Sequence, residues 1–364
     1  MTAVFVYGTL CHAPLRVVVL GREVPTVAGS VAGRVRSAAA HAVWQSGNGR
    51  VDGLLLAGLT ADERARLAFY AGVAGQRARK CQVVTDAGGA DAVMYTGGAG
   101  DGAGWSLPDW QARFAAAAVA AARDVMALYG RVGADAVARR YGQMLGRGAA
   151  RARALDAGPV TLRRAQGAGD VAVDAVAQPY ARFFAVEEYD LRFRRFDGSL
   201  SDSVNRAAFV MGDAVTVLPY DPVRDRVLLV EQFRAGPFVR GDAECWSLEA
   251  IAGRIDPGEA PEDAARREAV EEAGLSLGAL ERVASYYPTP GAVTEYIYSY
   301  VALVDLPEGA AGVFGVEGEA EDIRGHLVGF DRLMALVASG EVNNAPLVMT
   351  ALWLQRERGR LRAG

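Results

Sequence analysis

The hydrophobic and polar positions at the start of the chain predict a small, mainly β domain. Short apolar runs alternate there with turn residues, a pattern typical of short strands. One helix is expected over residues 61–70, and a glycine-rich tract over residues 97–104 predicts the end of the domain. The apolar runs are residues 4–6, 17–20, 51–56, 82–85 and 92–95. We therefore expect a first domain over residues 1–104.

The pattern then changes to one with helical spacing. From Pro108 to Leu145 apolar positions recur every three or four residues among residues that favour helices. The mixed arginines and alanines that continue to about Arg164 predict further short helical pieces. We therefore expect a helical connector over residues 105–181.

Strand-like runs return from residue 182 to the end of the chain. An Asp-Gly pair at 197–198 predicts a turn, and helices are expected over residues 261–273 and about 346–360. The strand-like runs are residues 191–196, 208–211, 214–218, 227–233 and 296–304. Sheets with a helix packed on each side predict an α/β/α sandwich over residues 182–364. The whole chain is then an α+β protein of two domains joined by the connector.

Composition narrows the function classes. The 364 residues are enough for two domains with full cores. Lys and Arg number 39 against 43 Asp and Glu, a net charge of −4 that favours neither nucleic acid nor an anionic membrane as a partner. The three widely spaced cysteines indicate a reducing compartment, and the three histidines lack zinc-ligand spacing. With no visible targeting segment or long apolar run, we expect a cytoplasmic protein that acts on a small molecule.

Candidate chemistry gathers in the helix expected over residues 261–273. Pro261 suits its first position and Gly274 its termination. Glu268 and Glu272 are four residues apart and Glu271 is three from Glu268, so their carboxylates crowd one face of the helix. Such crowding favours a divalent cation with hard oxygen ligands, magnesium or manganese.

Two further charged residues suit the same cluster. Arg267 precedes Glu271 by four residues and can pair with it, and Glu259 in the preceding loop can fold back toward it. A bound cation neutralises phosphate oxygens and lowers the pKa of bound water, which suits hydrolysis of a diphosphate. The alternative interpretation is a solvated acidic helix face with salt bridges between its own residues, which is what most charge runs are.

Residues 253–275 resemble the Nudix box, whose pattern is G-x5-E-x7-R-E-U-x-E-E-x-G-U with U aliphatic. The small Ala269 stands where a larger aliphatic residue is usual. The matching residues are Gly253, Glu259, Arg267, Glu268, Glu271, Glu272 and Gly274. The resemblance implies a Nudix fold and chemistry on a diphosphate.

More of this part of the chain is similar to one Nudix subgroup, the ADP-ribose pyrophosphatases. Pro290 lies 16 residues after Gly274, and a proline near this position marks the subgroup. The similar segments read VEQFR at 230–234, YPTPGAVTE at 287–295, EAEDI at 319–323 and GEVNNA at 340–345. The resemblance implies hydrolysis of ADP-ribose to AMP and ribose 5-phosphate with Mg²⁺ or Mn²⁺.

The subgroup also implies roles for single residues. Glu268 and Glu272 would bind the metal, together with the Ala252 carbonyl and Glu321 of the acidic loop. Glu319 becomes the candidate general base. Glu271 would bind metal or orient water, and Arg267 supports this catalytic group.

Other matching positions would contact the substrate. Arg206 and Arg234 suit phosphate or adenine, Glu295 matches a ribose-side position, and Pro290 belongs to the same substrate segment. Many members of the subgroup are homodimers, so we expect a homodimer in which Arg206 serves the partner's site.

The N-terminal residues FVYGTL at 5–10 resemble the signature of the γ-glutamylcyclotransferase-like fold, a small β-barrel-like domain. Tyr7, Gly8, Thr9 and Leu10 would then line a substrate pocket. The family's acid/base glutamate lies in a later segment, which here corresponds to residues 67–72, and Ala68 and Ala71 fill its two acidic positions. We therefore expect a non-catalytic pocket. The order of domains also resembles bacterial tellurite-resistance proteins, which indicates a phenotype and no mechanism.

Two alternatives to a diphosphate hydrolase stay open. The first is a γ-glutamylcyclotransferase with a Nudix appendage, against which Ala68 and Ala71 argue. The second is a protein that binds nucleotides without hydrolysing them, against which the complete set of glutamates argues.

Overall fold

The structure is a computed structural model that describes residues 3–38, 41–98, 104–156, 158–315 and 322–363. Contacts divide the chain into two compact units, Met1–Arg206 and Ala207–Gly364. Within the described ranges, no helix is both long and apolar enough to cross a membrane.

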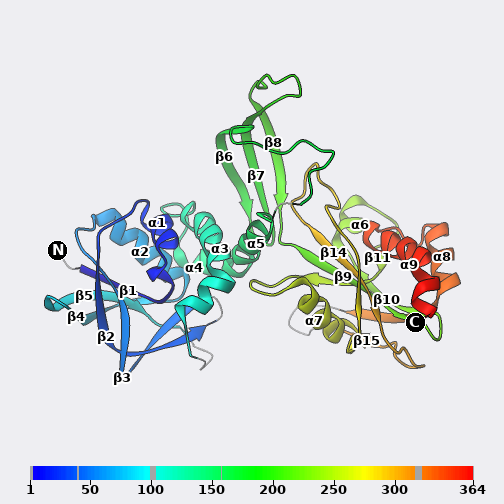
Figure 1. The fold of residues 1–364 in the computed structure, drawn as a ribbon, viewed down its shortest axis with the longest axis horizontal. Coiled ribbons are helices and arrows are strands. Elements are labelled where there is room, and N and C mark those ends of the chain that lie inside the picture. The colour runs from blue at the N-terminus through cyan, green and yellow to red at the C-terminus, as the bar shows by residue number, and fades with distance from the viewer. Residues whose placement is uncertain (1–2, 39–40, 99–103, 157, 316–321, 364) are drawn as a thin grey trace. The chain divides into compact units, whose positions relative to one another are not determined.

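In the described part of the first unit, five strands close a barrel (Figure 1). They are, in barrel order, β1 (Ala3–Tyr7), β3 (His41–Leu56), β2 (Thr26–Ala38), β4 (Arg77–Thr85) and β5 (Gly88–Thr96). The short 3₁₀ helix η1 (Gly8–Cys11) follows β1 directly. The expectation of a barrel-like, mainly β first domain therefore agrees with the architecture.

One expected strand of this unit is wrong. Residues 17–20 lie in a helix, α1 (Ala13–Leu20), which has a proline in its first turn and ends at Gly21 with φ of 87°. Leu15 and Val19, four residues apart, are fully buried on one side of it. A run of four apolar residues fits a strand and a buried helix equally, and here the flanking helix signals decide.

The helix α2 (Ala61–Val73) confirms the helix expected over residues 61–70. Its start is a capping box, in which the Glu63 backbone N–H donates to Thr60 Oγ1 at 3.1 Å and the Thr60 N–H donates to Glu63 Oε2 at 2.7 Å. This reciprocal pair satisfies two backbone donors that a helix start leaves open. The carboxylate of Glu63 therefore has a structural role.

The expected connector contains both helices and a strand. The helices α3 (Leu107–Met126), α4 (Ala134–Ala138) and α5 (Tyr141–Arg153) share one hydrophobic core with β1, α1 and α2. The helical expectation is wrong for residues 171–181, which form β6 (Val171–Ala181), a segment with three valines, which favour strands. This strand pairs with β7 (Ala185–Phe193), and β8 (Val204–Val210) completes a three-stranded sheet.

A buried ion network joins α3 and α5 to β7. Arg151 donates from Nη1 to Asp124 Oδ1 at 2.7 Å and from Nη2 to Glu187 Oε1 at 2.6 Å. Arg147, whose side chain is 2% exposed, lies 3.5 Å from Asp124 Oδ2. Tyr189 donates a further hydrogen bond to Glu187 at 2.5 Å. Two cations and two anions therefore neutralise one another in a network in which Arg147, Asp124 and Glu187 are buried and Arg151 is 36% exposed.

In the described part of the second unit, eight strands form one mixed sheet. The path runs β13-β14-β9-β10-β16-β15, while β11 pairs with β10 and β12 pairs with β9. Their bounds are β9 (Ala214–Asp221), β10 (Arg226–Phe233), β11 (Trp246–Glu249), β12 (Ile251–Arg254), β13 (Leu280–Tyr286), β14 (Ile297–Leu303), β15 (Val313–Phe314) and β16 (Ile323–Gly329). The helices are α6 (Ala235–Arg240), α7 (Pro261–Ala273), α8 (Phe330–Ser339) and α9 (Ala345–Ala363).

Helices cover both faces of this sheet (Figure 1). Residues of α7 such as Ala265 and Ala269 pack with Val215 and Leu228 on one face. Residues of α8 and α9 form the core on the other face with Leu218, Leu229 and their neighbours. The α/β/α sandwich expected for this part of the chain is therefore present.

The buried ion network yields a stability prediction. Glu187→Gln removes a charge from a group whose side chain is 6% exposed and leaves Arg151 without one of its two anions. We expect the β6–β7 hairpin to lose about 3 kcal/mol of opening free energy, measured by native-state hydrogen exchange.

Asp174→Asn on the same sheet is the matched control. Its partner Arg192 lies at 2.7 Å, but the two side chains are 35% and 41% exposed, so we expect a much smaller loss than for Glu187→Gln. Equal losses for the two variants would contradict the assignment of the buried network.

Candidate active site

The helix α7 presents the acidic cluster, and local signals fix its two ends. Pro261 stands in its first turn, and Gly274 ends it in the left-handed region at φ of 62°. The Gly274 N–H donates to Val270 O at 3.0 Å and the Leu275 N–H to Ala269 O at 2.9 Å, which closes the last turn. The helix of 13 residues predicted from the sequence is confirmed.

Arg267 is the centre of the cluster. It donates from Nε and Nη2 to the two carboxylate oxygens of Glu259, both at 3.0 Å. Its Nη1 donates to Glu268 at 2.7 Å and to Glu271 at 3.0 Å, and its Nη2 also donates to the Arg254 carbonyl at 2.9 Å. These hydrogen bonds, those to Glu259 above all, raise the pKa of Arg267. One guanidinium therefore joins the loop, the helix and the end of β12.

The two carboxylates expected to bind metal both lie against β12. An added Cβ at Gly253 would come within 1.9 Å of the Cδ and Oε1 of Glu268, so only glycine leaves room for this carboxylate. Glu272 is 2% exposed, and its Oε2 accepts a hydrogen bond from the Ala252 N–H at 3.2 Å. The strand and the helix thus bring Ala252, Glu268 and Glu272 together.

These groups suit a divalent cation in part. The carboxylates of Glu268 and Glu272 are hard oxygen ligands, which Mg²⁺ and Mn²⁺ prefer. Among the described residues no group of three or more acidic, histidine or cysteine side chains is arranged to hold a metal ion. The expected third carboxylate, Glu321, and the expected base, Glu319, both lie outside the described residues.

More charged residues meet at the sheet edge beside β12. Arg254 pairs in register with Ala214 of β9, and Ile297 of β14 pairs with the same residue, so the ends of three strands coincide. Burial raises the pKa of Glu295, which lies just before β14. Arg254 and Arg234 lower that pKa, and Asp213 raises it. Glu295 therefore lies among charges of both signs.

Arg234 is held in a fixed orientation at this edge. It donates from Nε and Nη2 to the two oxygens of Glu249, at 2.9 and 2.7 Å. Such a paired geometry leaves the guanidinium few rotamers and suits recognition of a phosphate or a base. Arg234 and Glu295 are expected from the sequence, whereas Glu249, Arg254 and Asp213 are not, because their neighbours lie on other strands.

Two further expected residues are not among the described contacts of this cluster. Arg206 belongs to the first unit, on β8, where its exposed side chain donates to the Asn205 carbonyl at 2.8 Å. Pro290 is exposed in a turn in which the N–H of Val293 donates to the Thr289 carbonyl at 3.0 Å. Their contacts with a substrate stay predictions.

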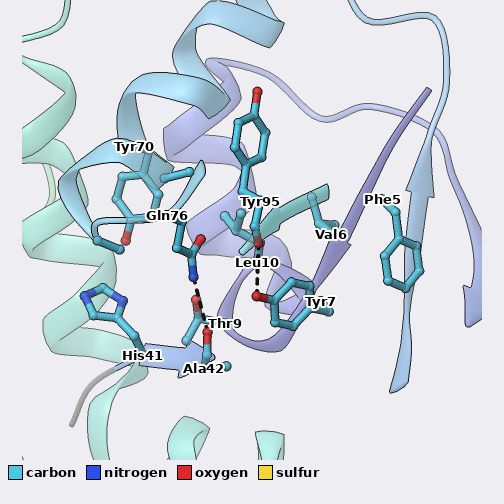
Figure 2. Close-up of a pocket in the computed structure, with 12 residues that line it drawn as sticks. Phe5, Val6, Tyr7, Thr9, Leu10, His41, Ala42, Tyr70, Gln76 and Tyr95 are labelled. Atoms are coloured by element: carbon cyan, nitrogen blue, oxygen red, sulfur yellow. Dashed lines mark hydrogen bonds between the residues drawn. The ribbon is translucent and has the colours of Figure 1, made fainter. Parts of the chain in front are cut away.

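The first unit has a pocket at the expected N-terminal motif (Figure 2). Its cavity volume is about 30 Å³. Gly8 has a φ of 61°, in the left-handed region that favours glycine. An added Cβ at this position would also come within 2.3 Å of the Ala42 Cβ. The lining residues are Phe5, Val6, Tyr7, Thr9, Leu10, His41, Ala42, Tyr70, Ala71, Ala74, Gln76 and Tyr95.

This pocket lacks the carboxylate that the cyclotransferase resemblance would require. The twelve described residues of the lining include neither aspartate nor glutamate. Ala71 lines the pocket at one of the two positions where the family has an acid, and Ala68 at the other is exposed. Of the nearby acids, Glu63 caps α2 and Asp62 accepts a hydrogen bond from Tyr129 at 2.9 Å.

His41 of this pocket yields a prediction on pH. Burial lowers its pKa to about 4, against about 6.5 in an unfolded chain. Between pH 6.5 and 4 the unfolded chain binds a proton that the folded barrel does not. Stability of the barrel therefore falls as pH falls through this window, by at most about 3 kcal/mol. Urea unfolding of the native chain and of His41→Phe checks this, and an equal pH dependence of the two would contradict it.

Known proteins that resemble this chain match its second half. The family profile described as NUDIX domain matches residues 211–349. ADP-ribose pyrophosphatase of Escherichia coli (strain K12) is 40% identical over 197 residues, which cover 54% of this chain and 91% of that protein. ADP-ribose pyrophosphatase of Haemophilus influenzae is 35% identical over 184 residues, with 50% and 84% covered. GDP-mannose pyrophosphatase of Salmonella choleraesuis (strain SC-B67) is 34% identical over 150 residues, with 41% and 77% covered.

Among solved structures, one titled "Crystal structure of ADP compounds hydrolase" aligns with 54% of this chain and 100% of its own, at 21% identity and a TM-score of 0.42. The sequence relatives above have higher identity with this chain, 34% to 40%. Because the chain covers 91% of the E. coli protein at 40% identity and carries a NUDIX domain, it belongs to the Nudix hydrolases, in the group of the ADP-ribose pyrophosphatases.

Proposed function

We propose that the protein hydrolyses the diphosphate of ADP-ribose to AMP and ribose 5-phosphate, with Mg²⁺ or Mn²⁺ as cofactor. The observation that carries this proposal is the convergence of Glu268 and Glu272 on Ala252 and Gly253 of β12. The choice of substrate is supported by the E. coli and H. influenzae relatives, which are both ADP-ribose pyrophosphatases.

Four groups of this chain would bind the cation, and Arg267 would hold two carboxylates in position. Glu268, Glu272 and the Ala252 carbonyl would hold the cation, with Glu321 as a further ligand. Such a cation neutralises phosphate oxygens and lowers the pKa of bound water. Arg267 holds Glu268 and Glu271 in place through its hydrogen bonds at 2.7 and 3.0 Å, so that the carboxylates need little rearrangement on binding.

Substrate contacts and the proton transfer complete the proposal. Arg234 would bind phosphate or adenine, because Glu249 already fixes its guanidinium. Glu295 and Pro290 would face the ribose, and Glu319 would accept a proton from the attacking water. In a homodimer, which we also propose, Arg206 would serve the partner's site.

The N-terminal barrel is proposed to bind a ligand without turning it over. Cyclisation of a γ-glutamyl group needs a positioned acid/base, and no described residue of the pocket carries a carboxylate. The lining of the pocket therefore argues against a cyclotransferase.

The central test is the loss of one carboxylate with the fold intact. For Glu272→Gln we expect the rate of AMP release from ADP-ribose with Mg²⁺ to fall about a hundredfold or more, since the amide is a poor ligand for the cation. Glu262→Gln is the matched control on the same helix, because the hydrogen bond that Glu262 accepts within the described residues comes from Tyr300, at 3.0 Å. Full turnover of Glu272→Gln would refute the metal assignment.

A panel of nucleoside diphosphate derivatives tests the substrate. We expect kcat/KM with Mg²⁺ to be highest for ADP-ribose, with GDP-mannose as the comparison that the Salmonella relative suggests. A preference for GDP-mannose would keep the enzyme class and overturn the substrate. Tight binding of ADP-ribose without AMP release would favour a binding protein instead.

Gly253→Ala tests whether activity depends on the position of the Glu268 carboxylate against β12. The added methyl group would lie 1.9 Å from that carboxylate and displace it from β12. We expect kcat to fall by at least about tenfold, with circular dichroism unchanged. Gly359→Ala in α9, where an added Cβ meets nothing within 4 Å, is the control and should keep full activity. Equal kcat values for the two variants would contradict the role of Gly253.

A further inference from the structure

Arg254 is the last residue of β12, and hydrogen bonds fix the backbone on both sides of it. Its carbonyl accepts from Arg267 Nη2 at 2.9 Å. The next residue, Ile255, donates its N–H to the Asp213 carbonyl at 3.1 Å. Residue 254 is therefore held between the acidic cluster of α7 and the start of β9.

The side chain of Arg254 lies on the face of the sheet away from α7. Side chains along a strand alternate between the two faces. Ile251 packs in the core beneath α7, and an added Cβ at Gly253 would meet Glu268 of the same helix. Ala250 packs instead in the core formed with α8 and α9. Arg254 shares the face of Ala250, because the two are separated by an even number of residues.

Glu295 lies beside Arg254 at the same end of the sheet. Arg254 and Ile297 both pair in register with Ala214. The Ala214 N–H donates to the Tyr296 carbonyl at 3.0 Å, which ties the segment of Glu295 to β9. Burial raises the pKa of Glu295, and among the charges that act on it the largest is that of Arg254, which lowers this pKa. The two side chains therefore interact across β9.

Arg254 is also close to the proposed cation site. It lies two residues after Ala252 on β12, and two residues of a strand span about 7 Å. The Ala252 N–H donates to Glu272 at 3.2 Å. This bond and the one from Arg267 to the Arg254 carbonyl lie along the same edge of β12, because backbone groups two residues apart point to the same side. A diphosphate bound at this edge can therefore contact both positions.

The side chains of Arg254 and Glu295 together suit a sugar phosphate. A guanidinium donates to two phosphate oxygens at once, and a carboxylate accepts from neighbouring hydroxyls. Ribose 5-phosphate carries both phosphate oxygens and vicinal hydroxyls, whereas adenine carries neither. The pair of opposite charges therefore matches the sugar half of ADP-ribose better than its base.

We propose that Arg254 is a specificity-determining residue that binds the phosphate of the sugar half of the substrate, while Glu295 accepts hydrogen bonds from the sugar hydroxyls. This inference rests on the proposed hydrolysis of a nucleoside diphosphate sugar. It assigns the side of the site on which the ribose 5-phosphate half lies. The AMP half then lies on the side of Arg234, which Glu249 holds in place.

Separate binding of the two products tests this assignment. Ribose 5-phosphate and AMP are each titrated into the full chain without metal, and binding is followed by phosphorus NMR. For Arg254→Leu we expect ribose 5-phosphate to bind about tenfold more weakly and AMP to bind within about twofold of the native chain, because a charge-assisted hydrogen bond is lost to one half only. With ADP-ribose and Mg²⁺, KM should rise about tenfold while kcat stays within about threefold.

Two further variants separate this contact from a general loss of charge or of fold. Arg254→Lys keeps the charge but loses the planar fork, so we expect ribose 5-phosphate to bind about threefold more weakly. Arg332→Leu in α8 is the control. It removes the same charge from a side chain that is 66% exposed and 3.8 Å from Glu341, and it should bind both products as the native chain does.

Three results would overturn the role of Arg254. They are unchanged ribose 5-phosphate affinity in a folded Arg254→Leu protein, equal weakening of both products in that variant, and no binding of ribose 5-phosphate to the native chain. A native chain that releases no AMP from ADP-ribose would refute the proposed hydrolysis instead. The selective loss of ribose 5-phosphate binding in Arg254→Leu would still support the role of Arg254, since that measurement involves neither metal nor turnover.

Discussion

The candidate active site depends on the hydrogen bonds of one guanidinium. Arg267 bonds three carboxylates and a backbone carbonyl, and these belong to the loop before α7, to α7 itself and to the end of β12. Without a cation among them, Glu259, Glu268 and Glu271 would repel one another and spread into solvent. Arg267 therefore sets the relative positions of the strand and the helix as well as the charge balance. The remaining geometry follows, because Glu268 and Glu272 can meet β12 only if the helix lies close to it.

Close approach of α7 to the sheet rests on small side chains. The buried face of α7 includes Ala264, Ala265, Ala269 and Ala273, all at most 3% exposed. Gly253 also permits close packing on the strand, because the Glu268 carboxylate occupies the space that a side chain at position 253 would need. Ala269, which is smaller than the family pattern usually has, fits this close packing. Packing and chemistry are thus set by the same few residues.

The bounds of α7 could be predicted from local sequence signals. The residues around it could not, because they contact it only through the tertiary fold. Pro261 and Gly274 act within one turn of themselves, so the bounds of the helix could be given from sequence. Residues 17–20 were misjudged because four apolar residues carry no period, and the capping glycine at 21 was the signal that could have corrected the assignment. Asp213 and Glu249 could not be found, since each meets its neighbours across strands that are paired only in the fold. The long strand β2 was also missed, because its glycines and arginines interrupt any alternation.

The acidic cluster of the second unit and the pocket of the first unit differ in charge. The second unit collects carboxylates and arginines at a sheet edge, and partial burial strengthens their mutual interactions and the pull on a charged ligand. The pocket of the first unit excludes charge, and its one titratable ring with a pKa near neutrality in the unfolded chain is kept uncharged by burial. A ligand suited to one site is for that reason disfavoured at the other. If both sites are occupied in the same protein, they take different classes of molecule, so the barrel cannot serve as a second site for the diphosphate substrate itself.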